Sequence, residues 1–585
     1  MCGDVFNGSI LKWLRGHPAK VLDWVTDARV RISLLPPLLK YKIKSKNNSF
    51  LILFYKYFYI ININMQKKNI LNIMMIVLIS FLFITTVSLT ITSLILSWPL
   101  AWIYFVIFVV IMYFINTYYT IKIFYDKDRI NTSKKNWLLG FCLLPGVATF
   151  FYLWLGFKPD LTDAKNNYIT GRKLIKEYES KPENTTDDDL KKISNFFKNT
   201  WDVDYSNNNN IKLIEDNFDL YKKSIDLIRS AEKSIIVQYY IISKDEWFNT
   251  FANELIKKSK QGVQIYFLVD WIGSIGRYNK GIINKLRKNN INFELFTNNK
   301  FPLLHHDHNT RNHKKILIID NKKGLYGGSN LSEEYLPFRK NTSYWRDINF
   351  DIEGEVVNRF TLNFISDYVN NTKTKETVKQ IIKKFENKGI IKLNGSDEIL
   401  EKNSKSFVME SDPSIYHNPI ENSLLQLIMK AKKSIHITTP YFDTTDVILD
   451  ALITASLSGI DVKILLPGKP DNKNFIIPFN QKNYEKLKNT NIQVFEYEGF
   501  YHGKMTLIDD DVSLIGSFNY DLRSIYLNKE DFIISFSNQL NYELKTLFYK
   551  DIKHSRLVDL KKNKENKKFN EKVKVSILEI FALIF

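Results

Sequence analysis

The sequence contains almost no cysteine, which limits the kinds of site that it can build. Its 585 residues include two cysteines, Cys2 and Cys142. Two isolated cysteines exclude a disulfide framework and a zinc site made of paired cysteines. Long apolar runs are also missing from most of the chain, since the next one after residue 156 is the short stretch 575–585. Segments that could cross a bilayer are therefore confined to the region before residue 157.

Three apolar stretches in that region, 70–96, 99–124 and 137–156, are each long enough to span a bilayer. Aromatic residues cluster at their ends, as interfacial anchors do. We therefore predict N-terminal transmembrane helices and a multi-pass protein of the cell membrane. Pro145 and Gly146 interrupt the third stretch, so a re-entrant hairpin is an alternative there. The two alternatives place the rest of the chain on opposite sides of the membrane.

The net charge is strongly positive, with 82 Lys and Arg against 62 Asp and Glu, or +20. A basic surface suits an anionic bilayer, but it would serve nucleic acid equally well. The abundance of Lys, Asn and Ile also fits an A/T-rich genome. The charge alone therefore does not identify a partner.

One eight-residue pattern occurs twice and is the most informative feature of the chain. The two copies are His313-x-Lys315-x-x-x-x-Asp320 and His502-x-Lys504-x-x-x-x-Asp509. Each copy runs into a strand-like stretch and then into a turn of small residues that ends in asparagine. These turns are Gly327-Gly328-Ser329-Asn330 and Gly516-Ser517-Phe518-Asn519. One copy would be a weak signal in a lysine-rich chain, but two copies with the same downstream turn are a strong one.

The spacing of the pattern suits chemistry on a phosphodiester. Alternate side chains of a strand share a face, so His313 and Lys315 point the same way, as do His502 and Lys504. One histidine can attack phosphorus and the other can protonate the leaving oxygen. The lysines and the turn asparagines would supply charge and donors to the phosphoryl oxygens. Two half-sites that meet would make one active site.

Each half of the chain also offers a carboxylate that could orient its own histidine, Asp347 in the first half and Glu530 in the second. A carboxylate on one ring nitrogen fixes the tautomer and leaves the other nitrogen free for chemistry. Asp320 and Asp509 complete the candidate catalytic set, but we expect them to be structural, bonding backbone or the partner half. The residues assigned to phosphate binding or support are Asn330, Asn519, Ser517, Asp347 and Glu530.

The repeat extends well beyond the motif. The residue pattern of each half predicts the order strand, helix, strand, helix, strand and motif strand. This alternation indicates an α/β sandwich. The helix-like segments are 247–260 and 447–458. The matching strand-like stretches are 231–240 with 431–441, 262–268 with 459–465, and 290–296 with 490–496.

These patterns divide the chain into seven parts. Met65, followed by lysines and an apolar run, resembles a natural start, and we assign no function to the residues before it. The predicted parts are an extension (1–64), a membrane domain (65–157), a polar linker (158–210), a first lobe (211–371), a linker with a lysine-rich helix-like stretch (372–406), a second lobe (407–556), and a charged, then apolar tail (557–585).

The chain resembles the bacterial cardiolipin synthases of the phospholipase D superfamily. The resemblance rests on both motifs and their turns, and on Trp345-Arg346-Asp347, Thr439-Pro440-Tyr441-Phe442, Asp521-x-Arg523-Ser524 and Leu527-Asn528-Lys529-Glu530. It implies two phospholipase D-like lobes with one shared active site. It also implies that a phosphatidyl group passes between two phosphatidylglycerols through a phosphohistidine, giving cardiolipin and glycerol without a metal or another cofactor. We favour His313 as the nucleophile.

Alternatives to this function share its chemistry. One is a membrane-bound phospholipase D that uses water or another alcohol as acceptor. Another is a membrane-tethered phosphodiesterase that acts on nucleic acid, although we do not expect nucleic acid to be a partner. A third is a membrane scaffold whose active site has decayed. The cluster His305, His306, Asp307 and His308 could suit a metal, but it has no counterpart in the second copy, so we predict no metal site. The oligomeric state stays open.

Overall fold

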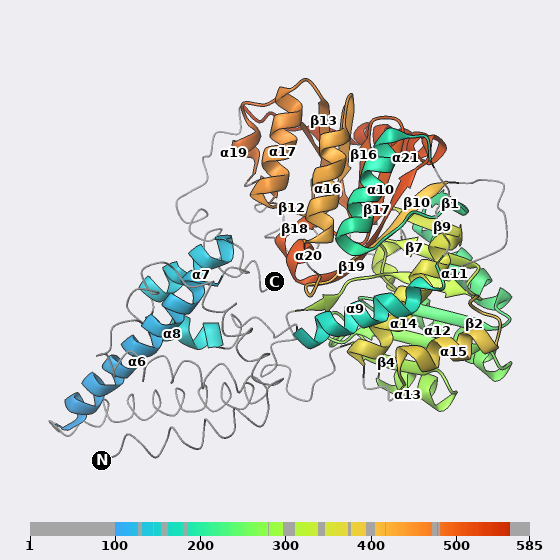
Figure 1. Cartoon of the computed structure of the whole chain (residues 1–585), viewed down its shortest axis with the longest axis horizontal. Helices are drawn as coiled ribbons and strands as arrows, with labels where there is room; N and C mark the ends of the chain where they lie inside the picture. The colour runs from blue at the N-terminus through green and yellow to red at the C-terminus, as the bar shows by residue number, and fades with distance from the viewer. Residues whose placement is uncertain are drawn as a thin grey trace, which may run out of the picture. The chain divides into compact units, whose positions relative to one another are not determined.

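The structure is a computed structural model of the chain. It describes residues 100–126, 131–143, 145–153, 162–179, 185–278, 280–296, 310–336, 345–372, 376–392, 404–415, 417–470, 477, 480–481 and 483–561. Figure 1 shows two α/β lobes, the first mostly green and yellow and the second orange and red.

The first lobe is built on a seven-stranded sheet with helices on both faces. Its strands are β1 (Asn209–Ile214), β2 (Ser234–Tyr239), β3 (Gln264–Asp270), β4 (Asn292–Phe296), β6 (Ile316–Ile319), β7 (Lys323–Gly327) and β9 (Asn349–Gly354), with the short strands β5 (Arg311–Asn312) and β8 (Trp345–Arg346) outside this sheet. Its helices are α11 (Asn217–Ser230), α12 (Glu246–Lys260), α13 (Lys280–Lys288), η5 (Glu333–Tyr335) and α14 (Glu355–Asn371).

The second lobe repeats this plan. Its main strands are β10 (Lys405–Ser411), β11 (Ser434–Thr438), β13 (Asp461–Pro467), β14 (Gln493–Tyr497), β16 (Met505–Ile508), β17 (Val512–Gly516), β19 (Asn528–Phe536) and β20 (Ser555–Leu557). The short strands are β12 (Phe442–Asp443), β15 (Phe500–Tyr501) and β18 (Tyr520–Asp521). The helices are α16 (Pro419–Lys430), α17 (Asp446–Leu457), α19 (Tyr484–Leu487), α20 (Leu522–Tyr526) and α21 (Asn538–Ile552).

The two sheets have the same strand order, which confirms the predicted duplication into two α/β lobes. The order is β1-β9-β7-β6-β2-β3-β4 in the first and β10-β19-β17-β16-β11-β13-β14 in the second, where β20 extends the edge. In each lobe the central strands run parallel and their helical crossovers include the predicted helices, α12 and α17. The motif strands β6 and β16 pair antiparallel with β2 and β11. Equivalent strands therefore carry both motifs.

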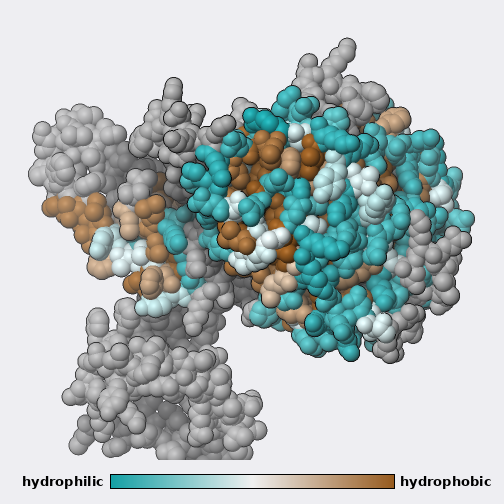
Figure 2. Space-filling model, turned by 90° about the horizontal axis from the view of Figure 1, so that it is seen from above, coloured by the Kyte–Doolittle hydropathy of each residue, from teal (hydrophilic) through white to brown (hydrophobic). Residues whose placement is uncertain are grey.

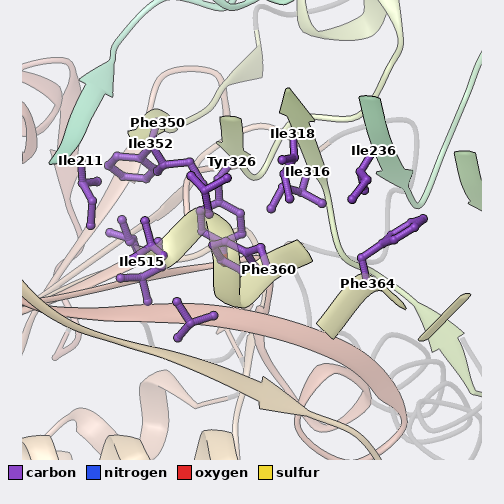
Figure 3. Close-up of a cluster of buried hydrophobic side chains, with 14 of the residues drawn as sticks. Ile211, Ile236, Ile316, Ile318, Tyr326, Phe350, Ile352, Phe360, Phe364 and Ile515 are labelled. Atoms are coloured by element: carbon purple, nitrogen blue, oxygen red, sulfur yellow. The ribbon is translucent and has the colours of Figure 1, made fainter. Parts of the chain in front are cut away.

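One apolar core joins the two sheets. Tyr326 of β7, Phe360 of α14 and Ile515 of β17 belong to the same buried cluster, part of which is drawn in Figure 3. Helices α14 and α21 supply side chains of this cluster, and both follow the last long strand of their sheet. Two further cores lie on the outer faces, one under α11, α12 and α13 and one under α16 and α17. The lobes thus share a core and hold each other in place.

The stretch 158–210, predicted as a polar linker, contains two helices that pack on different cores. Helix α9 (Thr162–Lys176) reaches the shared core through Ile175. Helix α10 (Asp188–Trp201) packs Phe197 and its apolar neighbours into the second lobe's outer core. Its apolar residues recur every three or four positions within a charged sequence, so overall composition conceals the amphipathic helix.

The second predicted linker, 372–406, carries the expected helix. This is α15 (Val378–Asn387), which begins with a capping box between Thr377 and Gln380 and buries Phe385. The shared core therefore extends past the first lobe into this connection.

Within residues 65–157, the described part of the chain contains three helices: α6 (Leu100–Phe124), α7 (Asn131–Leu143) and α8 (Pro145–Phe151). They pack on one another, since Asn116 of α6 bonds the Phe141 carbonyl of α7 and the Thr149 hydroxyl of α8. The third predicted membrane segment is thus broken into two short helices, and the second of them starts at Pro145.

The side chains of α6 are largely apolar and exposed. Val110 and Phe114 are examples, and this apolar surface is brown in Figure 2. Within the described ranges, however, the structure contains no helix that combines the length and hydropathy needed to traverse a bilayer. The predicted segment 70–96, the extension 1–64 and the apolar tail 575–585 lie outside the described residues.

Candidate active site

The two motif histidines lie where the lobes meet. His313 follows β5, and β5 pairs in parallel with β19 of the second lobe. His502 follows β15, and β15 pairs in parallel with β8 of the first lobe. The His313 N–H donates to the Lys529 carbonyl at 2.9 Å, and the His502 N–H donates to the Arg346 carbonyl at 2.6 Å. The short strand before each histidine, β5 or β15, is thereby aligned with a strand of the opposite lobe.

This alignment exchanges the carboxylates between the lobes. Nδ1 of His313 lies 3.0 Å from the carboxylate of Glu530, and Nδ1 of His502 lies 2.7 Å from Oδ2 of Asp347. We expected each carboxylate to orient the histidine of its own half, so the structure corrects that pairing. The reason is the register of the short parallel strands, which places each carboxylate beside the other lobe's histidine. Both rings then have Nε2 left for chemistry.

Lys315 and Lys504 are buried with the histidines. Nζ of Lys504 lies 3.0 Å from Nδ1 and 3.2 Å from Nε2 of His502, while Lys315 donates to the carbonyl of His313. Burial lowers the pKa of Lys315 to about 7. The negative charge of Glu530 opposes this lowering, and the positive charge of Lys504 adds to it. Burial likewise lowers the pKa of Lys504 to about 8. Two cations brought together in this way favour an anion between them.

The histidines are neutral at neutral pH for the same reason. Burial lowers the pKa of His313 to about 4 although Glu530 opposes this, and burial lowers the pKa of His502 to about 4 with help from Lys504. Each lysine also acts on the histidine of the opposite lobe, because Lys504 contributes to the lowering at His313 and Lys315 to that at His502. The two half-sites therefore form one electrostatic unit.

The carboxylates stay ionised despite their burial. Burial alone would raise the pKa of Glu530, but His313 and its hydrogen bonds hold it below its usual value. The Ser517 hydroxyl donates to Glu530 at 2.5 Å, and Asn528 Nδ2 donates at 3.1 Å. The candidate residue Ser517 thus lies behind the carboxylate and fixes its position.

In the first lobe the equivalent hydroxyl comes from Ser329, which sequence reasoning missed. Its Oγ donates to Oδ2 of Asp347 at 3.1 Å. The position equivalent to Ser517 is Gly328, and a Cβ there would lie 2.3 Å from Oδ1 of Asp347. The shorter carboxylate occupies that space, so the serine sits one position later in the turn. The Gly-Gly-Ser-Asn sequence of the turn was the available signal.

The turn asparagines are not placed alike. Oδ1 of Asn330 accepts from the Ile241 N–H, and its Nδ2 donates to the hydroxyl of Tyr335 at 2.8 Å. We expected this amide to face a phosphoryl oxygen, but it is engaged inside its own lobe. Oδ1 of Asn519 is buried without a hydrogen-bond partner among the described residues. Of the two asparagines, Asn519 therefore has the freer polar group.

The motif aspartates lie away from the histidines and close their strands. The carboxylate of Asp320 accepts from three consecutive backbone N–H groups that lead into β2, and the carboxylate of Asp509 does the same for β11. Both aspartates adopt positive φ, +53° and +52°. This geometry gives them a structural role within their own lobes.

Aromatic rings surround the histidines, although the sequence analysis gave none of them a role in the site. Tyr240 packs edge-on against His313 at 4.8 Å and lies under Lys315 at 5.5 Å. Tyr335 and Trp345 pack against His502 at 5.5 and 5.8 Å. Beside these rings, both histidine side chains are buried. The His305–His308 cluster lies outside the described residues.

Comparison with known proteins places the chain in a family. A family model described as "Cardiolipin synthase, PLD-like domain" matches residues 224–367 and 424–552. A cardiolipin synthase of Staphylococcus aureus (strain MW2) is 33% identical over 459 residues, which cover 75% of this chain and 89% of that protein. A cardiolipin synthase of Clostridium perfringens (strain 13 / Type A) is 32% identical over 435 residues, 71% of this chain and 87% of that protein.

Among solved structures, the phosphatidylserine synthase of Haemophilus influenzae Rd KW20 has a similar fold. Its TM-score is 0.52 at 18% identity, and the match covers 68% of this chain and 97% of that one. At this identity the likeness concerns the fold alone.

Proposed function

Because the chain belongs to the cardiolipin synthase family of phospholipase D-like proteins, we propose that it joins two phosphatidylglycerols into cardiolipin and releases glycerol. The observation that carries the proposal is the single buried cluster of two histidine–carboxylate pairs and two lysines. A phosphodiester between the lysines would have one imidazole on each side. The surrounding rings support transfer over hydrolysis, because they limit the access of water.

The first half-reaction forms a covalent intermediate. Nε2 of His313 attacks phosphorus and the P–O bond to glycerol breaks, while His502 gives a proton to the departing oxygen. We assign the attack to His313 because Nζ of Lys504 lies 3.0 and 3.2 Å from the two ring nitrogens of His502, and a cation this close makes that imidazole a poorer nucleophile. The anionic substrate would raise the pKa of His502 from about 4 and so supply the acid.

The second half-reaction reverses these roles. The neutral His502 takes the proton from a terminal hydroxyl of the second phosphatidylglycerol. That oxygen attacks phosphorus, and the P–N bond to His313 breaks to give cardiolipin and the free enzyme. Lys315 and Lys504 stabilise the negative charge that develops on the phosphoryl oxygens in both steps.

We further propose that residues 65–157 attach the enzyme to the cell membrane as a multi-pass segment. The exposed apolar side chains of α6 and the apolar stretch 70–96 support this. Attachment would keep the site close to substrates that diffuse in the bilayer. Lipid analysis of a host that lacks cardiolipin tests the function. Expression of the chain should produce cardiolipin, the His313→Ala variant should not, and absence of cardiolipin with the folded wild-type chain would refute it.

A further inference from the structure

A cation, buried in one case and partly buried in the other, directly precedes each of the two exchanged carboxylates. Arg346 precedes Asp347, and Lys529 precedes Glu530. Successive residues of an extended strand face opposite ways, so these cations point away from the histidines. Nε of Arg346 lies 3.2 Å from both carboxylate oxygens of Asp551.

The second cation makes the equivalent contact. Nζ of Lys529 lies 3.2 Å from Oδ1 of Asp367. Asp551 lies on α21 and Asp367 on α14, the two helices that follow β19 and β9. The two ion pairs are therefore related by the internal duplication.

Both ion pairs cross from one lobe to the other. Arg346 belongs to the first lobe and Asp551 to the second, while Lys529 belongs to the second and Asp367 to the first. The carbonyls of the same two cationic residues accept the N–H groups of His502 and His313. Each cationic residue is thus fastened to the opposite lobe twice, once through its backbone and once through its side chain.

We propose that these ion pairs are two latches, Arg346–Asp551 holding Asp347 on His502 and Lys529–Asp367 holding Glu530 on His313. All four latch residues are positioning residues, and the assignment of their separate effects rests on the proposed function. Each latch would act on one half of the acid–nucleophile pair. Loosening one would misplace a single carboxylate and leave the other in register.

The surroundings of the latches strengthen this role. The hydroxyl of Tyr501, the residue before His502, donates to Asp551 at 2.8 Å. Nζ of Lys314, the residue after His313, lies 2.7 Å from Asp367. Each latch aspartate therefore holds both the strand with the carboxylate and the strand with the histidine. Lys529 lies closer still to Asp412 of its own lobe, so the second latch belongs to a wider network in which Asp367 supplies the contact that crosses between lobes.

The choice of leaving group separates the two latches. A phosphatidyl ester of p-nitrophenol needs little protonation of its leaving oxygen, whereas phosphatidylglycerol needs the acid. With phosphatidylglycerol, Asp551→Asn and Asp367→Asn should each slow the first turnover roughly ten- to hundredfold, as small misplacements of catalytic groups do. With the nitrophenyl ester, the first-turnover rate of Asp551→Asn should recover to within about threefold of the wild-type rate. The misplaced His502 is the acid, and this leaving group needs little acid. Asp367→Asn should stay slow, because His313 is the nucleophile.

A matched control comes from a buried carboxylate elsewhere. Glu179 pairs with Arg359 at 3.1 Å and with Arg172. The Glu179→Gln variant removes a buried charge as the latch variants do, but its ratio of rates on the two substrates should equal that of the wild type. If Asp551→Asn does not fold, Arg346→Lys, which keeps the charge but changes its geometry, gives the same comparison.

The outcomes are distinct. Opposite leaving-group responses of the two variants support the latches, and a reversed assignment would mean that His502 is the nucleophile. The proposal would be overturned if both variants regained their rate with the nitrophenyl ester, or if both stayed slow with it. It would also be overturned if both kept the wild-type ratio of rates on the two substrates, as the control should. The release of glycerol or p-nitrophenol in the first turnover is measured before the second lipid or water reacts with the intermediate. The latches can therefore be judged even if the wild type makes phosphatidic acid in place of cardiolipin, which would refute only the proposed function.

Discussion

His313 and Glu530 are 217 positions apart and belong to different lobes, yet Nδ1 of the one lies 3.0 Å from the carboxylate of the other. The same exchange joins His502 to Asp347. Neither lobe alone therefore contains a complete histidine–carboxylate pair. The duplication produces one site because each half completes the other.

The shared site predicts how the histidine variants combine. His313→Ala and His502→Ala should each remove nearly all transfer activity, and the double variant should be little worse than either single one, because groups that act as a unit are not additive. Initial rates on mixed vesicles that contain phosphatidylglycerol measure this. A single variant with near wild-type turnover would show that the two half-sites work independently.

The carboxylates should behave according to the exchanged pairing. Asp347→Asn should behave as a weaker His502→Ala, releasing glycerol slowly from phosphatidylglycerol but regaining most of its rate with the nitrophenyl ester, since Asp347 acts through His502. Glu530→Gln should show the opposite pattern. Single-turnover rates with the nitrophenyl ester extend the measurement to slow variants. An Asp347→Asn variant that stays slow with the nitrophenyl ester would contradict the exchange.

The pH dependence follows from the buried cations. Below about pH 4, free-enzyme activity, kcat/KM, should fall because the attacking His313 must be neutral. Above about pH 4 it should decline because the acid His502 must be protonated, and it should decline more steeply through about 7 to 8, where Lys315 and Lys504 lose their protons and with them the charge that stabilises the phosphoryl group. A pH–rate profile on vesicles of constant composition measures both limbs. A plateau that extends well above the lysine values would contradict the assignment, whereas Lys315→Arg should move the falling limb upward.

The lysines, and no divalent cation, are expected to neutralise the phosphoryl group. Lys315→Met or Lys504→Met should lower kcat by roughly 10²-fold or more, as loss of a charge-stabilising donor does. Activity should survive strong chelation. Loss of activity on chelation that a divalent ion restores would instead implicate the His305–His308 cluster.

The motif aspartates should affect stability more than turnover. Asp320→Ala leaves three backbone N–H groups without their acceptor and should lower the free energy of unfolding by about 1–3 kcal/mol. The folded fraction should keep its kcat to within a few-fold. Thermal unfolding combined with activity per folded molecule separates these effects. A large loss of kcat at unchanged stability would make Asp320 a catalytic residue.

The sequence predicted the duplication and the chemistry because both depend on local patterns. Alternation puts His313 and Lys315 on one face, and the turn after each motif strand recurs. The exchanged carboxylates could not be read in this way, because they depend on parallel pairing between two-residue strands far apart in the chain. Ser329 was missed because it is displaced by one position, and α10 because its apolar stripe lies within a charged stretch.

The most direct test of the central claim is a product analysis of the full-length chain with phosphatidylglycerol as the sole phospholipid. Transfer between two lipids predicts cardiolipin and glycerol in equal amounts, with both lost in His313→Ala. Phosphatidic acid and glycerol without cardiolipin would contradict the claim, because the intermediate would then pass to water.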